Sequence, residues 1–172
     1  SDFVGAVLAG DVEQARSKKS SLKQYPILLS RDLDEVRYWL RSKARGSERF
    51  GLVASSNAMR LKPEGIHVKS GIEPATWFLN DKDDVRSSFS LEDAATEFDV
   101  QGLELDWVGM CWDANLTWHD NDWLKRRFSG TKWQSINDED RAKYLLNSYR
   151  VLLTRARQGL AIYMPKGSLD DV

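Results

Sequence analysis

The chain has few cysteines and histidines, which build disulfide frameworks and zinc sites, and it has no long apolar run. Its one cysteine, Cys111, can form neither an intramolecular disulfide nor a cysteine-based zinc site. No apolar stretch is long enough to cross a bilayer, and no secretory signal peptide is evident. Because the formal net charge is only -1, any surface for nucleic acid must be local. We therefore predict a cytoplasmic protein without a membrane partner.

The sequence also lacks the common short signatures of catalytic and metal sites. It has no glycine-rich loop ending in Lys and Ser or Thr, which cradles nucleotide phosphates and Mg²⁺, and no nucleophile elbow. Asp113, His119, Asp120 and Asp122 lie close in sequence, but turns are naturally rich in Asp and Asn, so we predict no metal site. The chain begins without Met, and we expect residues 1–172 to form one domain of a longer protein.

Short apolar segments alternate with helical patterns along the chain. The predicted strands span 26–30, 50–56, 105–112 and 160–164, and the predicted helices include residues 33–45 and 137–157. Strand, helix, strand in this order is typical of parallel sheets with crossover helices. We therefore predict an α/β fold, a three-layer sandwich around a mostly parallel sheet.

The most clearly marked element is the helix 137–157, which we expect to turn at Gly159 into the strand 160–164. Asn137 is in a capping position, and apolar residues recur along the helix at three- and four-residue spacing. Arg155 lies off this apolar stripe, near the end of the helix. On spacing alone, Arg155 and Arg157 simply favour the negative end of the helix dipole. The alternative is a cation directed at a bound anion.

Two further segments carry candidate binding residues. Ligands of open parallel sheets bind beyond the carboxyl ends of the strands, where Ser55, Asn57 and Arg60 would lie at the start of a short helix 57–61. A plain helix cap at Asn57 is the simpler alternative. The second segment, 96–104, alternates apolar and polar residues and then reaches Gly102, which on pattern alone predicts a strand and a tight connection to the next strand.

A tryptophan-rich insert occupies residues 113–136, and we expect it to form short antiparallel strands attached to the main sheet. Basic residues interleave with its tryptophans; the residues concerned are Trp118, Trp123, Lys125, Arg126, Arg127, Lys132 and Trp133. This pairing of charge and stacking surface suits single-stranded nucleic acid. The alternative is an aromatic mini-core with solvated charges outside.

Two of these segments resemble motifs of known helicases. Residues 147–159 (Asn-Ser-Tyr-Arg-Val-Leu-Leu-Thr-Arg-Ala-Arg-Gln-Gly) resemble the C-terminal part of the Schlafen group 3 type DNA/RNA helicase domain family. Within them, Thr-Arg-Ala is similar to the sixth motif of superfamily 1 helicases of the UvrD type. Residues 96–104 resemble the fifth motif, Thr-x-His-x-x-Lys-Gly-Leu-Glu, and the Ser-Asn-Ala step at 56–58 resembles a strand end of the second RecA-like domain. The resemblance covers most of 50–165.

The resemblance implies the second RecA-like domain of a P-loop NTPase fold, without its own P-loop. In such helicases the Arg of Thr-Arg-Ala is an arginine finger, and this role falls on Arg155. Gly102 would allow close backbone approach, and Glu104 and Arg157 would contact nucleotide. ATP and Mg²⁺ would bind only between this domain and an N-terminal P-loop domain of the same parent chain.

The resemblance also implies contacts to single-stranded DNA or RNA from Thr96, Ser55, Asn57 and Arg60. Gln101 replaces the usual Lys of the fifth motif, and Phe98 replaces its His. Phe98 would then either stack on a base or, as we expect, pack in the core. These departures leave open a second reading, a non-catalytic nucleic-acid-binding or regulatory module with a degenerate helicase fold.

Overall fold

The fold is built on a six-stranded sheet in which every neighbouring pair is parallel. A computed structural model describes residues 2–68 and 71–167, and its main sheet has the strand order β1-β9-β5-β2-β4-β3. These strands are β1 (Ile27–Ser30), β2 (Phe50–Ala54), β3 (His67–Val68), β4 (Asp93–Ala95), β5 (Leu105–Cys111) and β9 (Ala156–Tyr163). The predicted α/β class and parallel sheet are confirmed, and the sheet with its flanking helices is consistent with a RecA-like fold.

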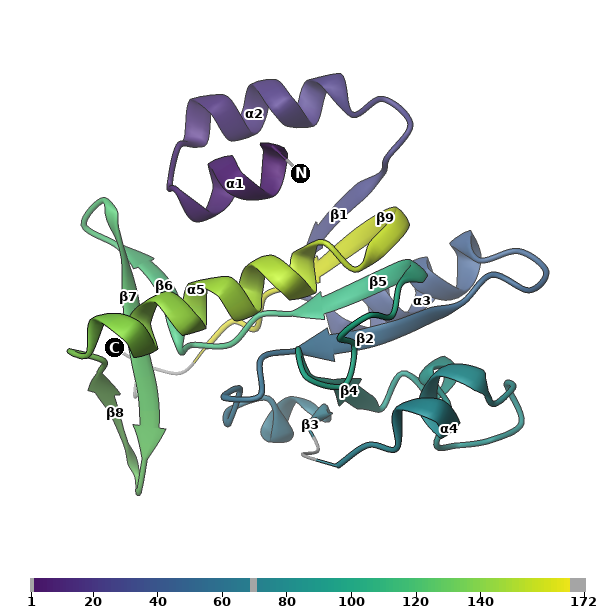
Figure 1. Cartoon of the computed structure of the whole chain (residues 1–172). Helices are drawn as coiled ribbons and strands as arrows, with labels where there is room; N and C mark the ends of the chain where they lie inside the picture. The colour runs from purple at the N-terminus through teal and green to yellow at the C-terminus, as the bar shows by residue number, and fades with distance from the viewer. Residues whose placement is uncertain (1, 69–70, 168–172) are drawn as a thin grey trace.

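Helices cover both faces of this sheet and complete three layers (Figure 1). They are α1 (Asp2–Leu8), α2 (Val12–Ser21), α3 (Leu33–Lys43), α4 (Pro74–Leu79) and α5 (Glu139–Leu153), with single 3₁₀ turns η1 (Lys62–Glu64) and η2 (Ser88–Ser90). On one face α3 packs against β2, β5 and β9, and on the other α1 and α5 cover a second apolar core. Among the described residues, no helix is both long and apolar enough to pass through a bilayer.

Helix α3 shows how the sequence fixes one of these layers. Asp32 caps it as predicted, because its Oδ1 accepts hydrogen bonds from the backbone N–H groups of Asp34 and Glu35 at 2.9 and 3.3 Å. Val36 and Leu40 on its apolar side are fully buried. A Cβ at Gly109 of β5 would lie 3.0 Å from Leu40 Cδ1, so glycine there permits the close packing of helix on sheet.

Helix α5 is shorter than predicted, and the strand after it is longer. The cap is Asp138 rather than Asn137, since Asp138 Oδ1 accepts from the N–H of Arg141 at 2.8 Å. The helix ends at Leu153, where the Thr154 hydroxyl donates to the carbonyls of Arg150 and Val151. Gly159 is not a turn residue.

Gly159 instead lies inside β9, opposite Trp107 in the register with β5. A Cβ at Gly159 would lie 2.5 Å from the Trp107 ring, so the glycine makes room for an indole. The strand begins at Ala156, which pairs with Leu105. Arg155 therefore lies in the connection between α5 and β9, and Arg157 lies on the strand itself.

The predicted secondary structure of two short segments was wrong. Residues 57–61 form turns before η1 rather than a helix. Residues 97–100 form a turn rather than a strand, because Asp99 Oδ2 accepts hydrogen bonds from the Thr96 N–H and hydroxyl, both at 2.8 Å. A short side chain that bonds its neighbours' backbone offers the chain an alternative to a strand ladder.

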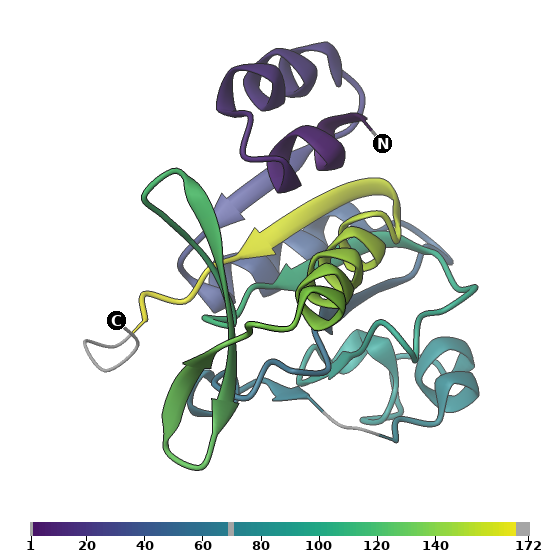
Figure 2. The ribbon, with the colours of Figure 1, turned by 60° about the vertical axis from the view of Figure 1, so that its left-hand side comes forward.

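The tryptophan-rich insert forms antiparallel strands, as predicted, but they make a sheet of their own. Its strands are β6 (Leu116–His119), β7 (Asp122–Ser129) and β8 (Lys132–Ser135), in the order β6-β7-β8. No described strand of the main sheet pairs with them, so the expected attachment is wrong. The hairpins instead stand across the ends of the β1 and β9 arrows (Figure 2).

Cys111 lies in β5 with no exposed surface, and burial raises the pKa of its thiol from the ordinary 9 to about 12. The unfolded chain therefore ionises Cys111 above pH 9 while the folded chain keeps the proton. The free energy of unfolding should be at its full value up to about pH 8 and should fall between about pH 8 and 10 by about 1.4 kcal/mol. Urea unfolding at both pH values measures this. Cys111→Ala should flatten the decline, and an equally steep curve for the variant would contradict the assignment.

Candidate functional site

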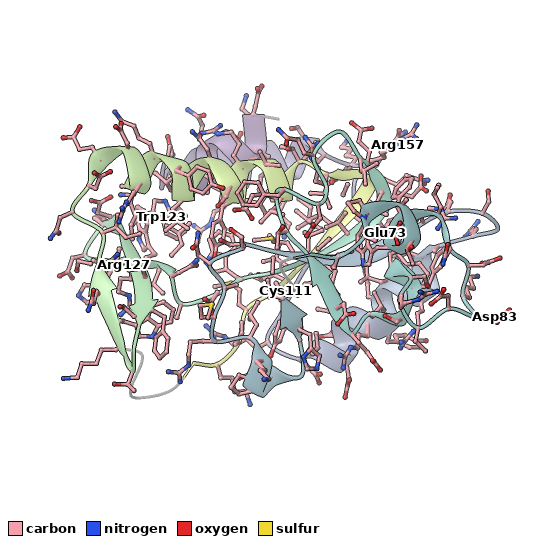
Figure 3. The ribbon with its side chains drawn as sticks, turned by 60° about the horizontal axis from the view of Figure 1, so that its bottom comes forward. Glu73, Asp83, Cys111, Trp123, Arg127 and Arg157 are labelled. Carbon is pink, nitrogen blue, oxygen red and sulfur yellow. The ribbon has the colours of Figure 1, made fainter. Side chains whose placement is uncertain are left out.

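The residues predicted from the sequence divide between the two ends of the main sheet. Gly102 and Glu104 directly precede β5, and Arg155 and Arg157 lie around the start of β9, so these four belong to the amino end. We call them the amino-end site. Ser55, Asn57, Arg60 and Thr96 follow β2 and β4 and form the carboxyl-end site. In Figure 3, Arg157 of the amino-end site lies on the opposite side of the molecule from Trp123 and Arg127, which belong to the insert.

The parallel register of β5 and β9 assembles the amino-end site. The Leu105 N–H donates to the Arg155 carbonyl at 3.1 Å, which holds the two connections together. Arg157 Nε lies 3.9 Å from Glu104 Oε2, and both side chains are more than half exposed, so this ion pair is weak and open to solvent. Gly102 has φ +79°, and nothing lies within 4 Å of the position of a Cβ there. Its turn needs glycine, and it leaves open space outside the backbone.

Arg155 is anchored at one atom of its guanidinium. Its Nε donates to the Val151 carbonyl at 3.1 Å, which ties the half-buried side chain to the last turn of α5. Within residues 2–68 and 71–167, no ion pair or further side-chain hydrogen bond of Arg155 is found. A guanidinium fixed through Nε keeps a planar pair of terminal donors, the geometry suited to phosphate or carboxylate oxygens.

A polar network beneath the amino-end site fixes the ends of three strands. Gln158 Nε2 donates to Glu48 Oε1 at 2.9 Å and to Asp106 Oδ1 at 3.1 Å. Trp107 Nε1 donates to Glu48 Oε2 at 2.9 Å, and this bond, followed by that from Gln158, lowers the pKa of the Glu48 carboxyl. The sequence analysis missed these residues. In the sequence, the only indication of these residues is that polar side chains occur near the ends of apolar strands.

Two hydroxyls of the carboxyl-end site are engaged within the protein. Ser55 is fully buried, and its Oγ accepts from the N–H of Asn57 at 3.2 Å. Thr96 is also buried, and its hydroxyl donates to Asp99. Asn57 itself is exposed. Ser55 and Thr96 thus shape the turns of this surface, while Asn57 presents its side chain to solvent.

The sequence analysis also missed Glu97 and Tyr144, which join this surface to α5. Glu97 is buried, and its carboxylate accepts hydrogen bonds from the Ser56 N–H at 2.8 Å, the Ser56 hydroxyl at 2.7 Å and the Tyr144 hydroxyl at 3.2 Å. Burial, and then the charge of Glu97, raises the pKa of Tyr144. The carboxylate therefore holds the turn after β2 against the helix.

Phe98 is exposed rather than packed in the core, contrary to our expectation. Its side chain is 61% exposed and stacks on Tyr144, with ring centroids 6.3 Å apart and planes at 26°. The turn made by Asp99 directs the ring outward. Because Tyr144 is bonded through Glu97 to the turn of Ser56, the aromatic pair gives this surface a stacking platform of the kind that unpaired bases use.

Two cations lie over aromatic rings of the insert, Arg126 from the insert itself and Arg60 from the turn after β2. The Arg126 guanidinium lies 5.4 Å from the Trp133 ring centroid, and that of Arg60 lies 5.3 Å from the Phe128 ring. The rings of Phe128 and Trp133 in turn pack edge to face at 5.2 Å. These contacts fit the aromatic mini-core that we had considered as the alternative, with rings that are half-buried rather than fully enclosed.

One comparison with known proteins gives a match. Residues 1–166, all but the last six, match the family described as Schlafen group 3, DNA/RNA helicase domain. No curated protein and no solved structure matches the chain significantly. The match reaches through both ends of the sheet and includes both candidate sites. On this match, the chain belongs to the Schlafen group 3, DNA/RNA helicase domain family.

Proposed function

We propose that this chain is the second RecA-like domain of a superfamily 1 type helicase or nucleic-acid-dependent ATPase. In this proposal Arg155 is the arginine finger of an ATP site that a P-loop domain of the same parent chain completes. The observation that carries the proposal is the Arg155 guanidinium, which is anchored through Nε to the Val151 carbonyl at the end of α5. The Arg155 backbone accepts a hydrogen bond from Leu105, the residue after the exposed Glu104, which pairs with Arg157. Family membership supports a helicase-related role.

The amino-end site suits a triphosphate that is held mainly by another domain. Arg155 and Arg157 provide two cations, Glu104 an exposed carboxylate, and Gly102 a turn without a side chain. ATP with Mg²⁺ supplies a γ-phosphoryl group whose transfer to water builds charge on its oxygens. In the proposal Arg155 places donors against that charge, Arg157 adds a second cation and Glu104 contacts the nucleotide sugar. The P-loop and the metal ligands belong to the partner domain.

The carboxyl-end site is proposed as the surface for single-stranded DNA or RNA. Asn57 and Phe98 offer an exposed amide and an exposed ring, and Ser55 and Thr96 shape the turns that carry them. Arg60 adds a cation next to Phe128. Residues 96–104 run from the end of β4 to the start of β5, so one short segment joins both candidate sites. A shift of this segment on nucleic-acid binding would reach Glu104 directly.

The proposal predicts ATP hydrolysis that single-stranded DNA or RNA stimulates in the parent protein with its P-loop domain. Phe98→Ala should raise the nucleic-acid concentration needed for half-maximal stimulation by about 5- to 150-fold, because one base stack contributes about 1 to 3 kcal/mol. Tyr38→Ala is the matched control, since Tyr38 is a 73% exposed ring on α3. Equal behaviour of the two variants would remove Phe98 from the interface. Absence of hydrolysis with either nucleic acid would favour a non-catalytic module.

A further inference from the structure

A large groove lies at the carboxyl end of the sheet, between α1 and the β6–β7 hairpin, and shares Arg60 with the carboxyl-end site. Its volume is about 770 Å³, and a second cavity of about 280 Å³ adjoins it along the ring of Trp118. The floor is aliphatic, and the wall toward the insert is aromatic; the residues are Ile27, Leu29, Ile162, Met164, Trp118 and Trp123. Such a volume and lining are typical of binding sites.

The floor of this groove ends at an open edge of the main sheet. Strand β1 pairs with β9 on one side and with no other described strand on its other side. The carbonyls of Pro26 and Ser30 accept from the N–H groups of Leu160 in β9 and of Met164 just after it. Leu29, the residue before Ser30, therefore directs its N–H and C=O to the open edge. The Leu29 side chain is 61% exposed. No charged residue or proline within β1 blocks the pairing of another strand.

The lining of the groove carries more cations than carboxylates, although the chain as a whole is nearly neutral. Five cations line the groove against two carboxylates; they are Lys19, Arg31, Arg60, Arg126 and Lys166 against Glu64 and Asp113. Arg31 directly follows β1, and its Nη1 donates to the Pro165 carbonyl at 3.2 Å, which fixes a cation at the end of the open edge. A ligand therefore needs apolar surface within the groove and negative charge at its rim.

We propose that the groove binds an extended segment of a partner protein in which apolar and acidic residues alternate, and that this segment pairs with β1 as an added strand. Backbone pairing to an open edge gives affinity, and pockets for alternate side chains give selectivity. Apolar side chains of the segment lie on Leu29 and Trp118, and its carboxylates meet Arg31 and the other cations. An open strand edge suits an added strand better than it suits a helix or a nucleic-acid backbone, neither of which brings alternating N–H and C=O groups to it.

Peptide binding to this chain tests the proposal without ATP or nucleic acid. The probe is a short fluorescent peptide of alternating leucine and aspartate, followed by fluorescence anisotropy. Two matched peptides separate the contributions: one with lysine for each aspartate, and one with alternate backbone amides methylated, which removes the pairing donors and keeps the side chains. The lysine peptide and the N-methylated peptide should each bind at least about tenfold more weakly than the leucine-aspartate probe. Hydrogen exchange of the Leu29 backbone amide should slow only with the leucine-aspartate probe. Equal binding of all three would overturn the proposal.

Variants locate the binding in the groove. Leu29→Asp should weaken binding of the leucine-aspartate peptide by at least about tenfold, and Arg31→Glu should reverse the preference between the aspartate and lysine peptides. Val85→Asp is the control, since Val85 is a 78% exposed aliphatic residue that lies outside the groove lining. If Leu29→Asp and Val85→Asp bind alike while thermal melts show both folded, the proposal fails. Displacement of the peptide by a single-stranded oligonucleotide, with sensitivity to Trp118→Ala, would assign the groove to nucleic acid and overturn it as well.

Discussion

Arg155→Ala is expected to reduce ATP hydrolysis about a thousandfold or more in a protein that contains this chain and its P-loop domain. The alanine removes a guanidinium whose Nε is held by the Val151 carbonyl, so the donors lost are ones that the fold already orients. The loss should appear in kcat more than in KM, because the charge that Arg155 meets develops in the transition state. Steady-state ATPase assays with saturating single-stranded DNA or RNA measure both constants.

Two controls separate an arginine finger from a helix-end charge. Arg141→Ala removes an exposed arginine from the first turn of the same helix and should leave turnover nearly unchanged. Arg155→Lys keeps the charge but not the planar pair of donors, so it should remain strongly impaired.

The isolated chain should fold and hydrolyse no ATP, since it carries no P-loop. If Arg155→Ala were as active as Arg141→Ala, Arg155 would be only a favourable charge at the end of α5.

Tyr149→Ala is expected to lower the free energy of unfolding by about 3 to 5 kcal/mol. The ring is fully buried and packs on Trp112 with centroids 4.7 Å apart. Its hydroxyl donates to Asn115 Oδ1 at 2.6 Å and accepts from the N–H of Asp113 at 3.2 Å. Tyr149→Phe keeps the packing and leaves those buried groups short of a partner, so it should cost about 1 to 3 kcal/mol.

Urea unfolding of the two Tyr149 variants measures packing and hydrogen bonding separately. Tyr38→Ala serves as the control, because this exposed ring should change stability by no more than about 0.5 kcal/mol. A phenylalanine variant as stable as wild type would mean that water replaces the hydroxyl at Asp113 and Asn115. A Tyr149→Ala variant within error of Tyr38→Ala would contradict the position of this ring in the core.

The central strands could be predicted because both of their faces are buried. Phe50–Ala54 and Leu105–Cys111 read as nearly continuous apolar runs, which is what a strand covered by helices on both sides requires. Strands β3 and β4 were missed. They have two and three residues, and the exposed His67 and half-buried Asp93 interrupt the pattern.

The details of the candidate sites depend on contacts that a periodic pattern does not contain. The helical spacing of apolar residues continues to Ala156, so the end of α5 at Leu153 follows only from the pairing of Ala156 with Leu105. Phe98 is exposed because Asp99 bonds the backbone of Thr96, and the sequence alternation predicted the opposite. The roles assigned to Arg155, Glu104 and Asn57 remain predictions, although their places at the two ends of the sheet are now defined.

The position of β9 in the sheet has a consequence for synthesis on the ribosome. Among the described strands β9 is the last in chain order, yet it lies between β1 and β5 and is the only described neighbour of β1. A nascent chain that stops before residue 156 therefore exposes unpaired edges on β1 and β5 at once, together with the apolar Leu29. β1 can join the sheet only after β9 has emerged, so chains that stop before β9 are expected to be the aggregation-prone species in cells.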